Sequence, residues 1–254
     1  MQLLLLLKQK PVDTLTTADL KRYMLYAMQK EGISENTAHS RLNALKFYFE
    51  QVIGRENFFW EIPRPKKPMK LPKVISEEKI LEGLCAVNNI KHKTLLLPAY
   101  SAGLRVSEVV QLKITDINSD RMQILIREGK GKKDRMVTLS SSILLLLREY
   151  YKEYKPGEWL FEGQNAGEHY STRSAQLIFK AACKKPGLPE NCSFHSLQHS
   201  YATHLLENGT DITYIQKLLG HNDIKTTLRY THVSNKEIGK IESPLDRPMR
   251  KKGI

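Results

Sequence analysis

The sequence has little that would place it in a membrane or an oxidising compartment. Among its 254 residues are only three cysteines, Cys85, Cys183 and Cys192, and their spacing matches neither a metal site nor a disulfide framework. No apolar run approaches the roughly 20 residues of a membrane span. The short run Leu3–Leu7 lacks the cleavage pattern of a signal peptide. We therefore expect a cytoplasmic protein with no membrane partner.

Several catalytic signatures are also missing. The chain has no P-loop, no acidic metal cluster and no EF-hand-like loop. His195 and His199 have the i, i+4 spacing of a zinc hydrolase helix, but no glutamate stands between them as general base. We therefore set the zinc hydrolase aside and expect no metal and no cofactor.

Acidic residues are outnumbered. The chain has 27 Asp and Glu against 40 Lys and Arg, which gives a net charge of +13 and a pI near 9.5. Such a balance favours a polyanionic partner, nucleic acid first, although on charge alone a merely basic surface is the alternative. The chain is 41% hydrophobic and 26% charged, typical of a soluble globular protein, and long enough for one large domain or two smaller ones.

The first 62 residues are predicted to be helical. One helix follows Thr14 or Thr16, and a second runs from Ser34 to Gly54 with an apolar stripe at Leu42, Leu45, Phe49 and Val52. The first turns of the second helix are either an ordinary solvated helix start or a surface that contacts DNA. The candidate DNA contacts there are Thr37, His39 and Arg41.

A proline-rich basic segment follows, and we interpret residues 63–75 as an extended interdomain linker. Its candidate DNA contacts are Lys66 and Lys67. From Ser76 a second domain begins with a capped helix, then a largely apolar helix over 92–101 and, after a break at Gly103, a helix over 106–112.

Arg105 precedes this last helix, and Glu108 lies one turn after it. A guanidinium beside an apolar segment is costly to bury without an anionic partner, but an Arg105–Glu108 surface pair is the common alternative. Alternating runs over 122–127 and 135–139 flank GKGKKD and predict a hairpin with Lys130 in its turn, beside a short strand at 116–117. Helices over 141–151 and 172–184 complete this frame.

The stretch from Cys192 to Ser234 carries the densest set of chemical groups. An amphipathic helix is predicted over 193–206, with His195, Gln198 and His199 near its start, where unpaired N–H groups favour an anion. A short helix follows from Asp211 to Leu219, and His221 lies just beyond Gly220. A third helix begins near Asp223, and we expect it to carry Tyr230.

Five segments resemble, in order, the motifs of the tyrosine recombinases, the phage-type and Xer-like integrases. They are SAGLRVSEVVQL, GKGKKDRMVTLS, HSLQHSYATHLLENG, IQKLLGH and TTLRYTHVS, and they span most of residues 75–235. The resemblance implies a small all-α N-terminal core-binding domain (1–62), which we expect to be abbreviated or truncated here, because only residues 1–12 precede the first helix. It also implies a mixed α/β, mainly helical catalytic domain with a small antiparallel sheet (76–241), followed by a basic tail (242–254).

The resemblance also implies roles. Tyr230 attacks the scissile phosphate to give a 3′-phosphotyrosyl enzyme, Arg105 clamps that phosphate and Lys130 protonates the leaving 5′ oxygen. His195 and His221 donate hydrogen bonds to the phosphate, and His195 is also a candidate acceptor of the tyrosine proton.

Supporting roles follow from the same resemblance. Glu108 orients Arg105, and His199 is expected to act structurally. Backbone contacts to DNA are expected from Lys132, Lys133 and Arg135. Neither ATP nor metal is implied. The partner is a double-stranded recombination site, bound as a dimer per site and a tetramer in the synapse.

One position departs from the pattern: Gln198 stands where the family has its second arginine. Arginine offers a permanent charge and two parallel N–H groups, whereas glutamine offers one neutral NH₂ at shorter reach. Losing one preorganised donor costs on the order of 10²–10³ in rate, about 3–4 kcal/mol. DNA binding should survive, because it is spread over many phosphates. We therefore expect weak or absent cleavage, and the alternative is a non-catalytic DNA-binding protein of the same fold.

Overall fold

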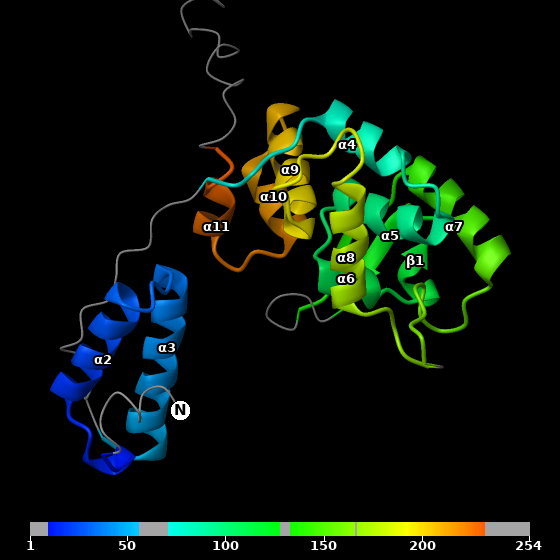
Figure 1. The fold of residues 1–254 in the computed structure, drawn as a ribbon. Helices are drawn as coiled ribbons and strands as arrows, with labels where there is room; N and C mark the ends of the chain where they lie inside the picture. Colours follow the sequence, from blue (N-terminus) through cyan, green and yellow to red (C-terminus); the bar gives the residue numbers. More distant parts are fainter. Residues whose placement is uncertain (1–9, 56–70, 128–132, 166, 232–254) are drawn as a thin grey trace, which may run out of the picture. The chain divides into compact units, whose positions relative to one another are not determined.

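The computed structural model describes residues 10–55, 71–127, 133–165 and 167–231 (Figure 1). The chain divides into two compact units, Met1–Lys70 and Leu71–Ile254. This agrees with the predicted two-domain class. Most of the expected linker, all of the tail over 242–254, and the candidates Lys66, Lys67, Lys130 and Lys132 lie outside the described residues. In the part of the chain that is described, no helix is long and apolar enough to cross a membrane.

The first unit is helical in its described part. It contains the 3₁₀ turn η1 (Val12–Thr14), α2 (Thr17–Gln29), α3 (Glu35–Phe47) and the π-helical turn η2 (Tyr48–Val52). A capping box opens α2, in which Thr16 and Asp19 bond each other's backbone N–H groups. Leu20, Met24, Leu42 and Phe49 form its core.

The expected apolar stripe of the second helix is wrong at its last position. Val52 is 61% exposed, although Phe49 is fully buried. The reason is the wider π-helical turn over 48–52, which shifts the side-chain period away from that of an α-helix.

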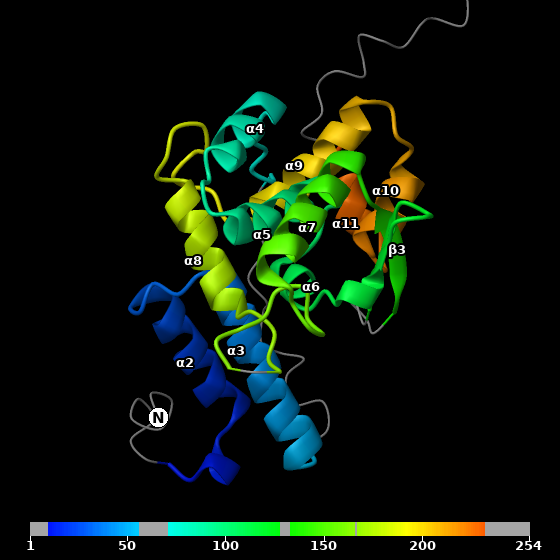
Figure 2. The ribbon, with the colours of Figure 1, turned by 90° about the vertical axis from the view of Figure 1, so that its right-hand side faces the viewer.

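The second unit is mainly helical, with one small sheet at its side (Figure 2). Its elements, in chain order, are α4 (Glu77–Cys85), α5 (Ile90–Ser101), α6 (Val106–Val110), η3 (Ile114–Asp116), β1 (Ile117–Asn118), β2 (Gln123–Ile126), β3 (Arg135–Thr138), α7 (Ser141–Tyr154), α8 (Thr172–Ala182), α9 (Phe194–Glu207), α10 (Ile212–Leu219) and α11 (Ile224–Leu228). Ser76 precedes α4 as expected, but its side chain makes no capping hydrogen bond.

The strands pair antiparallel in the order β1-β2-β3, as predicted. Ile124 pairs with both Ile117 and Val137, and Ile126 pairs with Arg135. Ile124, Ile126 and Val137 are buried on the face that packs into the main core. Figure 2 shows α10 beside β3, which brings the sheet close to the C-terminal helices.

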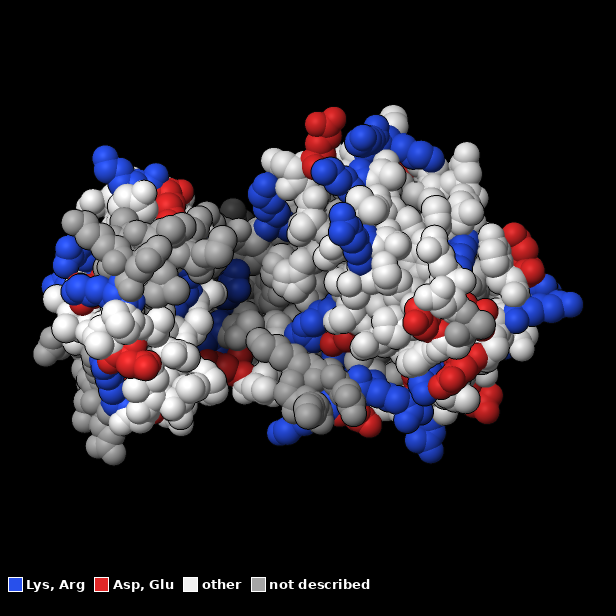
Figure 3. Space-filling view, turned by 60° about the horizontal axis from the view of Figure 1, so that its bottom comes forward, with Lys and Arg blue, Asp and Glu red and all other residues white. Residues whose placement is uncertain are grey.

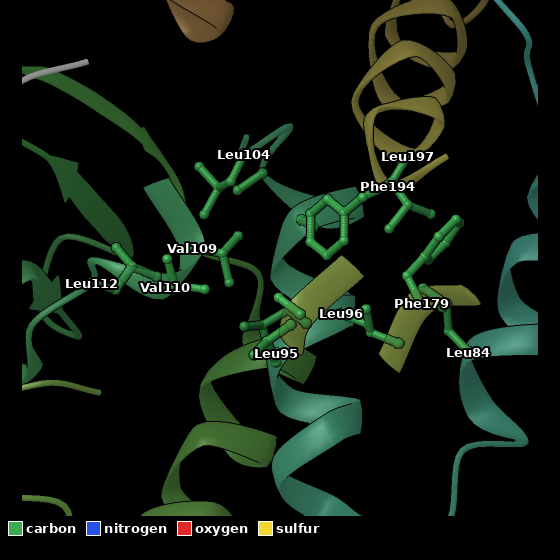
Figure 4. Packing of buried hydrophobic residues seen from close by; sticks show 14 of the residues in the cluster. Leu84, Leu95, Leu96, Leu104, Val109, Val110, Leu112, Phe179, Phe194 and Leu197 are labelled. Atoms are coloured by element: carbon green, nitrogen blue, oxygen red, sulfur yellow. The ribbon is translucent and has the colours of Figure 1, made fainter. Parts of the chain in front are cut away.

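Helix α9 runs through the interior of this unit. Phe194 and Leu197 point into a cluster with Leu95 and Leu96 of α5 and Phe179 of α8 (Figure 4). The predicted amphipathic character is wrong, because hydroxyl residues on the other sides are buried as well: Ser196, Ser200 and Thr203. The Ser200 hydroxyl donates to the Ser196 carbonyl and accepts from the Ile75 N–H, so one of these polar positions is satisfied within the fold.

The two last helices begin where the sequence indicated. Asp211 caps α10, Gly220 ends it in the left-handed region at φ 63°, and Asp223 caps α11. Tyr230 is not part of α11, which ends at Leu228; it lies in the turn that follows. Capping and the glycine stop therefore set the positions of both His221 and Tyr230.

Candidate active site

A buried carboxylate joins two arginines at the centre of the site. The Glu108 side chain is 6% exposed and accepts hydrogen bonds from Arg105 Nη1 at 2.7 Å and from Arg135 Nη1 and Nη2 at 2.8 Å. The Arg105 backbone N–H also donates to it at 2.8 Å. Burial alone would raise the pKa of Glu108, but the bonds and charges of Arg135 and Arg105 lower it below its usual value. The group is therefore a carboxylate at neutral pH.

The same arginines hold the end of α10. Arg105 Nη2 donates to the Leu219 carbonyl at 2.9 Å, and Arg135 Nε donates to the Leu218 carbonyl at 2.7 Å. Cations at a helix C-terminus satisfy its last carbonyls and its dipole. The arginine pair thus fixes the turn that leads to His221.

Gln198 lies next to this cluster but faces the protein. It is fully buried, and its Nε2 donates to the Gly103 carbonyl at 2.7 Å. Its Oε1 has no hydrogen-bond partner among the described residues. The amide therefore ties down the backbone two residues before Arg105.

Gly103 must be a glycine at this turn. Its φ is +63°, and a Cβ there would lie 2.3 Å from the Tyr201 ring. Close packing against Tyr201 and the bond to Gln198 hold the turn that presents Arg105.

Tyr230 and two histidines form the second half of the site. The Tyr230 hydroxyl lies 3.0 Å from His199 Nδ1, and the rings of His199 and His195 pack edge to face with centroids 4.3 Å apart. His195 is exposed, His199 is half-buried and Tyr230 is 2% exposed. His221 Nδ1 lies 3.0 Å from Thr227 Oγ1, so its ring is oriented by a residue of the last turn of α11.

The site favours neutral histidines and a neutral phenol. Burial raises the pKa of Tyr230 to about 12, against the smaller opposing effects of the Arg229 and Arg105 charges. Burial, together with His195, Arg229 and His221, lowers the pKa of His199 to about 3. Although His195 is exposed at the pocket, desolvation of its ring against the neighbouring side chains, together with Arg105 and Arg229, lowers its pKa. The positive charge of Arg105 therefore lowers the pKa of both His195 and Tyr230.

A pocket opens beside these groups. It has a volume of about 570 Å³, and Arg105 and His195 line it together with Ser107, Lys180 and Ser193. An anion held there would meet a guanidinium, an imidazole and an ammonium, and it would also lie near the carboxylate of Glu190, which lines the same pocket. No group of three or more His, Cys, Asp or Glu within the described ranges could hold a metal ion.

Arg135 is not the surface group that the sequence suggested. Its side chain is only 9% exposed, and its guanidinium is occupied by Glu108 and Leu218. The reason is strand alternation: Arg135 shares the inward face of β3 with Val137. We correct its expected role from DNA contact to internal partner of Glu108.

The other described DNA candidates lie at or near the surface. Thr37 and Lys133 are exposed and His39 is half-buried. Arg41 is 28% exposed and pairs with Glu31 at 2.8 Å, and it also donates to the Tyr23 hydroxyl at 3.0 Å. Lys and Arg side chains, with Asp and Glu between them, are spread over the face of the molecule that Figure 3 shows.

Comparison with known proteins identifies the family. Residues 73–237 match the model of the phage integrase family, and residues 1–57 match that of the phage integrase N-terminal SAM-like domain. The chain belongs to the phage integrase family of tyrosine recombinases. This confirms the resemblance found in its motifs.

Its similarity to individual members of this family extends along most of the chain. It is 40% identical to an integrase/recombinase, y4qK, of Sinorhizobium fredii, over 93% of this chain and 77% of that one. It is 37% identical to tyrosine recombinase XerA of Pyrococcus horikoshii, over 84% and 75%. A crystal structure of XerH site-specific recombinase bound to difH substrate superposes with a TM-score of 0.73 at 25% identity, covering 94% of this chain and 74% of that one.

Two contacts in this tyrosine recombinase were missed from the sequence. Strand alternation could have indicated that Arg135 points inward with Val137 and Leu139. The His199–Tyr230 contact had no local signal, because the two residues are 31 positions apart and meet only when the last turns fold back on α9.

Proposed function

We propose that the chain is a site-specific DNA recombinase that cuts and rejoins DNA through a 3′-phosphotyrosyl intermediate at Tyr230. The observation that carries this proposal is that the Tyr230 hydroxyl contacts His199, the His199 ring packs against that of His195, and His195 lines a pocket together with Arg105. XerH, a structural neighbour, was solved bound to its difH substrate, which supports double-stranded DNA as the partner.

In the proposed reaction the Tyr230 oxygen attacks the phosphorus while the bond to the 5′ oxygen breaks. Arg105 neutralises the non-bridging oxygens, and His195 and His221 donate hydrogen bonds to them. Lys130 supplies the proton to the 5′ oxygen. The free 5′ hydroxyl later attacks a phosphotyrosyl bond, so the energy of the original linkage is retained.

Glu108 and Arg135 do not contact the phosphate directly in this proposal; they act on it through Arg105. One carboxylate shared by two guanidinium groups leaves a net positive charge and fixes the rotamer of Arg105. This is the preorganisation that a developing phosphorane charge requires.

DNA contacts and assembly complete the proposal. Lys132 and Lys133 contact the backbone near the cut. Contacts to the DNA backbone further from the cut come from Thr37, His39, Arg41, Lys66 and Lys67. Two protomers bind one site and four form the synapse.

Cleavage is proposed to be impaired as the sequence stands. The Gln198 NH₂ is neutral and donates to the Gly103 carbonyl, so it is not offered to a phosphate. The same observation favours a second candidate, a DNA-binding protein that keeps the fold without the chemistry. Both candidates predict DNA binding, and only the first predicts a covalent adduct.

The test is adduct mapping. The full chain is incubated at length with a nicked duplex that carries the joined ends of its encoding element, and covalent products are digested and sequenced by mass spectrometry. We expect a nucleotide attached to Tyr230, absent in Tyr230→Phe and retained in Tyr201→Phe, a buried tyrosine nearby. An adduct that survives Tyr230→Phe, or none in either this chain or Gln198→Arg, would refute the recombinase proposal.

A further inference from the structure

The hydroxyl of Tyr230 contacts a histidine that the motif analysis treated as structural. His199 Nδ1 lies 3.0 Å from the Tyr230 oxygen, within the 2.6–3.2 Å that a general base needs. His195, the candidate suggested by the sequence, is exposed and packs against the His199 ring. Among the described contacts of Tyr230, the basic nitrogen at its hydroxyl belongs to His199.

His199 is neutral in the free protein, which leaves one ring nitrogen able to accept a proton, but its low pKa makes it a weak base until a phosphate binds. Because burial and nearby cations keep the pKa of His199 near 3 in the free protein, its ring is neutral and one nitrogen carries a lone pair. The groups that face it are His195 on its own helix, His221 after α10 and Arg229 beside Tyr230. A bound phosphate would offset these positive charges and make the ring more basic at the moment of attack.

His199 also lies next to an exposed side chain. The His199 ring is in edge-to-face contact with that of His195, which is exposed at the pocket. A proton on the half-buried ring is therefore one side chain away from solvent.

We propose that His199 is a catalytic residue that accepts the phenolic proton of Tyr230 during strand cleavage. The proposal rests on the recombinase function proposed above. As the tyrosine oxygen bonds to phosphorus, its proton moves to His199 Nδ1, and the electron pair of the breaking bond leaves on the 5′ oxygen. Rejoining reverses the transfer, and His199 returns the proton to the phenol.

The contact could instead only position Tyr230, so the variants must separate the two roles. His199→Asn keeps a short hydrogen-bonding group but cannot take a proton at neutral pH, whereas His199→Ala removes both functions. His204→Asn is the matched control, because His204 is buried on the same helix and its Nδ1 lies 2.9 Å from another tyrosine hydroxyl, that of Tyr100.

Adduct formation is followed in single turnover, with each change placed in the full Gln198→Arg chain. The probe is the nicked duplex with sulfur at the bridging 5′ position, so that the leaving group needs no acid and the attack of Tyr230 limits the rate. General-base loss costs at least about 10²-fold, so we expect that loss for both His199 variants and little change for His204→Asn. Imidazole in the buffer should partly restore His199→Ala.

The pH profile gives a readout that positioning alone would not move. Without an internal base, the logarithm of the rate should rise about one unit per pH unit, as expected for hydroxide-dependent ionisation of a phenol whose pKa is far above the assay pH. With His199 present, the profile should level off. Melting curves of the variants verify that each is folded.

Two results would overturn the assignment while leaving the recombinase function in place. His199→Asn reacting at the rate of its Gln198→Arg parent would mean that the contact only positions Tyr230. A loss confined to His195→Asn would move the base to His195. If no adduct forms in any chain, the recombinase function falls and this proposal with it; if Tyr230 reacts undiminished without His199, this proposal alone falls.

Discussion

Glu108 is the residue on which the arginine pair depends. Replacing it by glutamine leaves two nearly buried guanidinium groups without a counter-charge. Breaking a buried ion pair in this way costs about 3–5 kcal/mol in unfolding free energy. Urea denaturation should show that loss for Glu108→Gln. Glu158→Gln, which removes an exposed partner of Lys113, should cost at most about 1 kcal/mol. Equal losses in the two variants would contradict the proposal that Glu108 holds the two arginines in place.

The same carboxylate predicts how stability depends on pH. The pKa of Glu108 is lowered in the folded state from a usual value of 4.5, so its contribution is complete above that pH. It is lost as the pH falls through the folded value, where the carboxylate takes up a proton and the arginines lose their partner. Unfolding free energies measured downward from pH 6 should therefore fall more steeply for the parent than for Glu108→Gln. Parallel curves would show that Glu108 is not the linked group.

At the scale of elements, the turn from α5 to α6 is the most constrained connection of the site. Gly103→Ala adds both left-handed strain and a clash with the Tyr201 ring. Gly209→Ala is its control, with φ +85° and nothing within 4 Å of the added carbon. Strain alone costs about 1–2 kcal/mol and overpacking about 1–3 kcal/mol more. Thermal unfolding should thus separate the two variants, and a milder effect at Gly103 would contradict the close packing seen there.

The sequence predicted most of the elements because their signals are local. Capping by Thr16, Asp211 and Asp223 and the glycine stop at Gly220 placed helix ends within a few residues. Motif order gave the candidate site residues only by resemblance, and their catalytic roles remain predictions. Periodicity failed for α9, because Ser196, Ser200 and Thr203 are polar in the sequence and yet buried in the fold. The hydroxyl groups of Ser196 and Ser200 bond to the backbone there.

The site contacts could not be predicted in the same way. Arg135 reaches Glu108 across 27 positions and His199 reaches Tyr230 across 31, and both contacts depend on how separate elements pack. The orientation of Gln198 toward the Gly103 carbonyl, 95 positions away, depends equally on tertiary structure. Residue identity at a motif position therefore does not reveal which partner the side chain takes.

At the scale of the whole molecule, the net charge of +13 predicts salt-sensitive DNA binding. A protein with about six to ten phosphate contacts loses roughly 10³–10⁵ in affinity between about 50 and 200 mM salt. Titrations of a labelled duplex should give a slope of that size for the full chain and a shallower one for residues 71–254 alone. Equal slopes would mean that the first unit does not contact the DNA backbone.

The most direct measurement is the single-turnover rate of phosphotyrosyl adduct formation on the nicked duplex, compared between this chain, Gln198→Arg and Gln198→Met. Placing arginine at position 198 should raise the rate by about 10²–10³, because its guanidinium is charged and donates two parallel hydrogen bonds. Methionine, of similar size and without charge, should not raise it. DNA affinity should change little among the three. Equal measurable rates in all three chains would contradict the proposed impairment by Gln198. No adduct in any of them, with DNA still bound, would favour the non-catalytic DNA-binding protein.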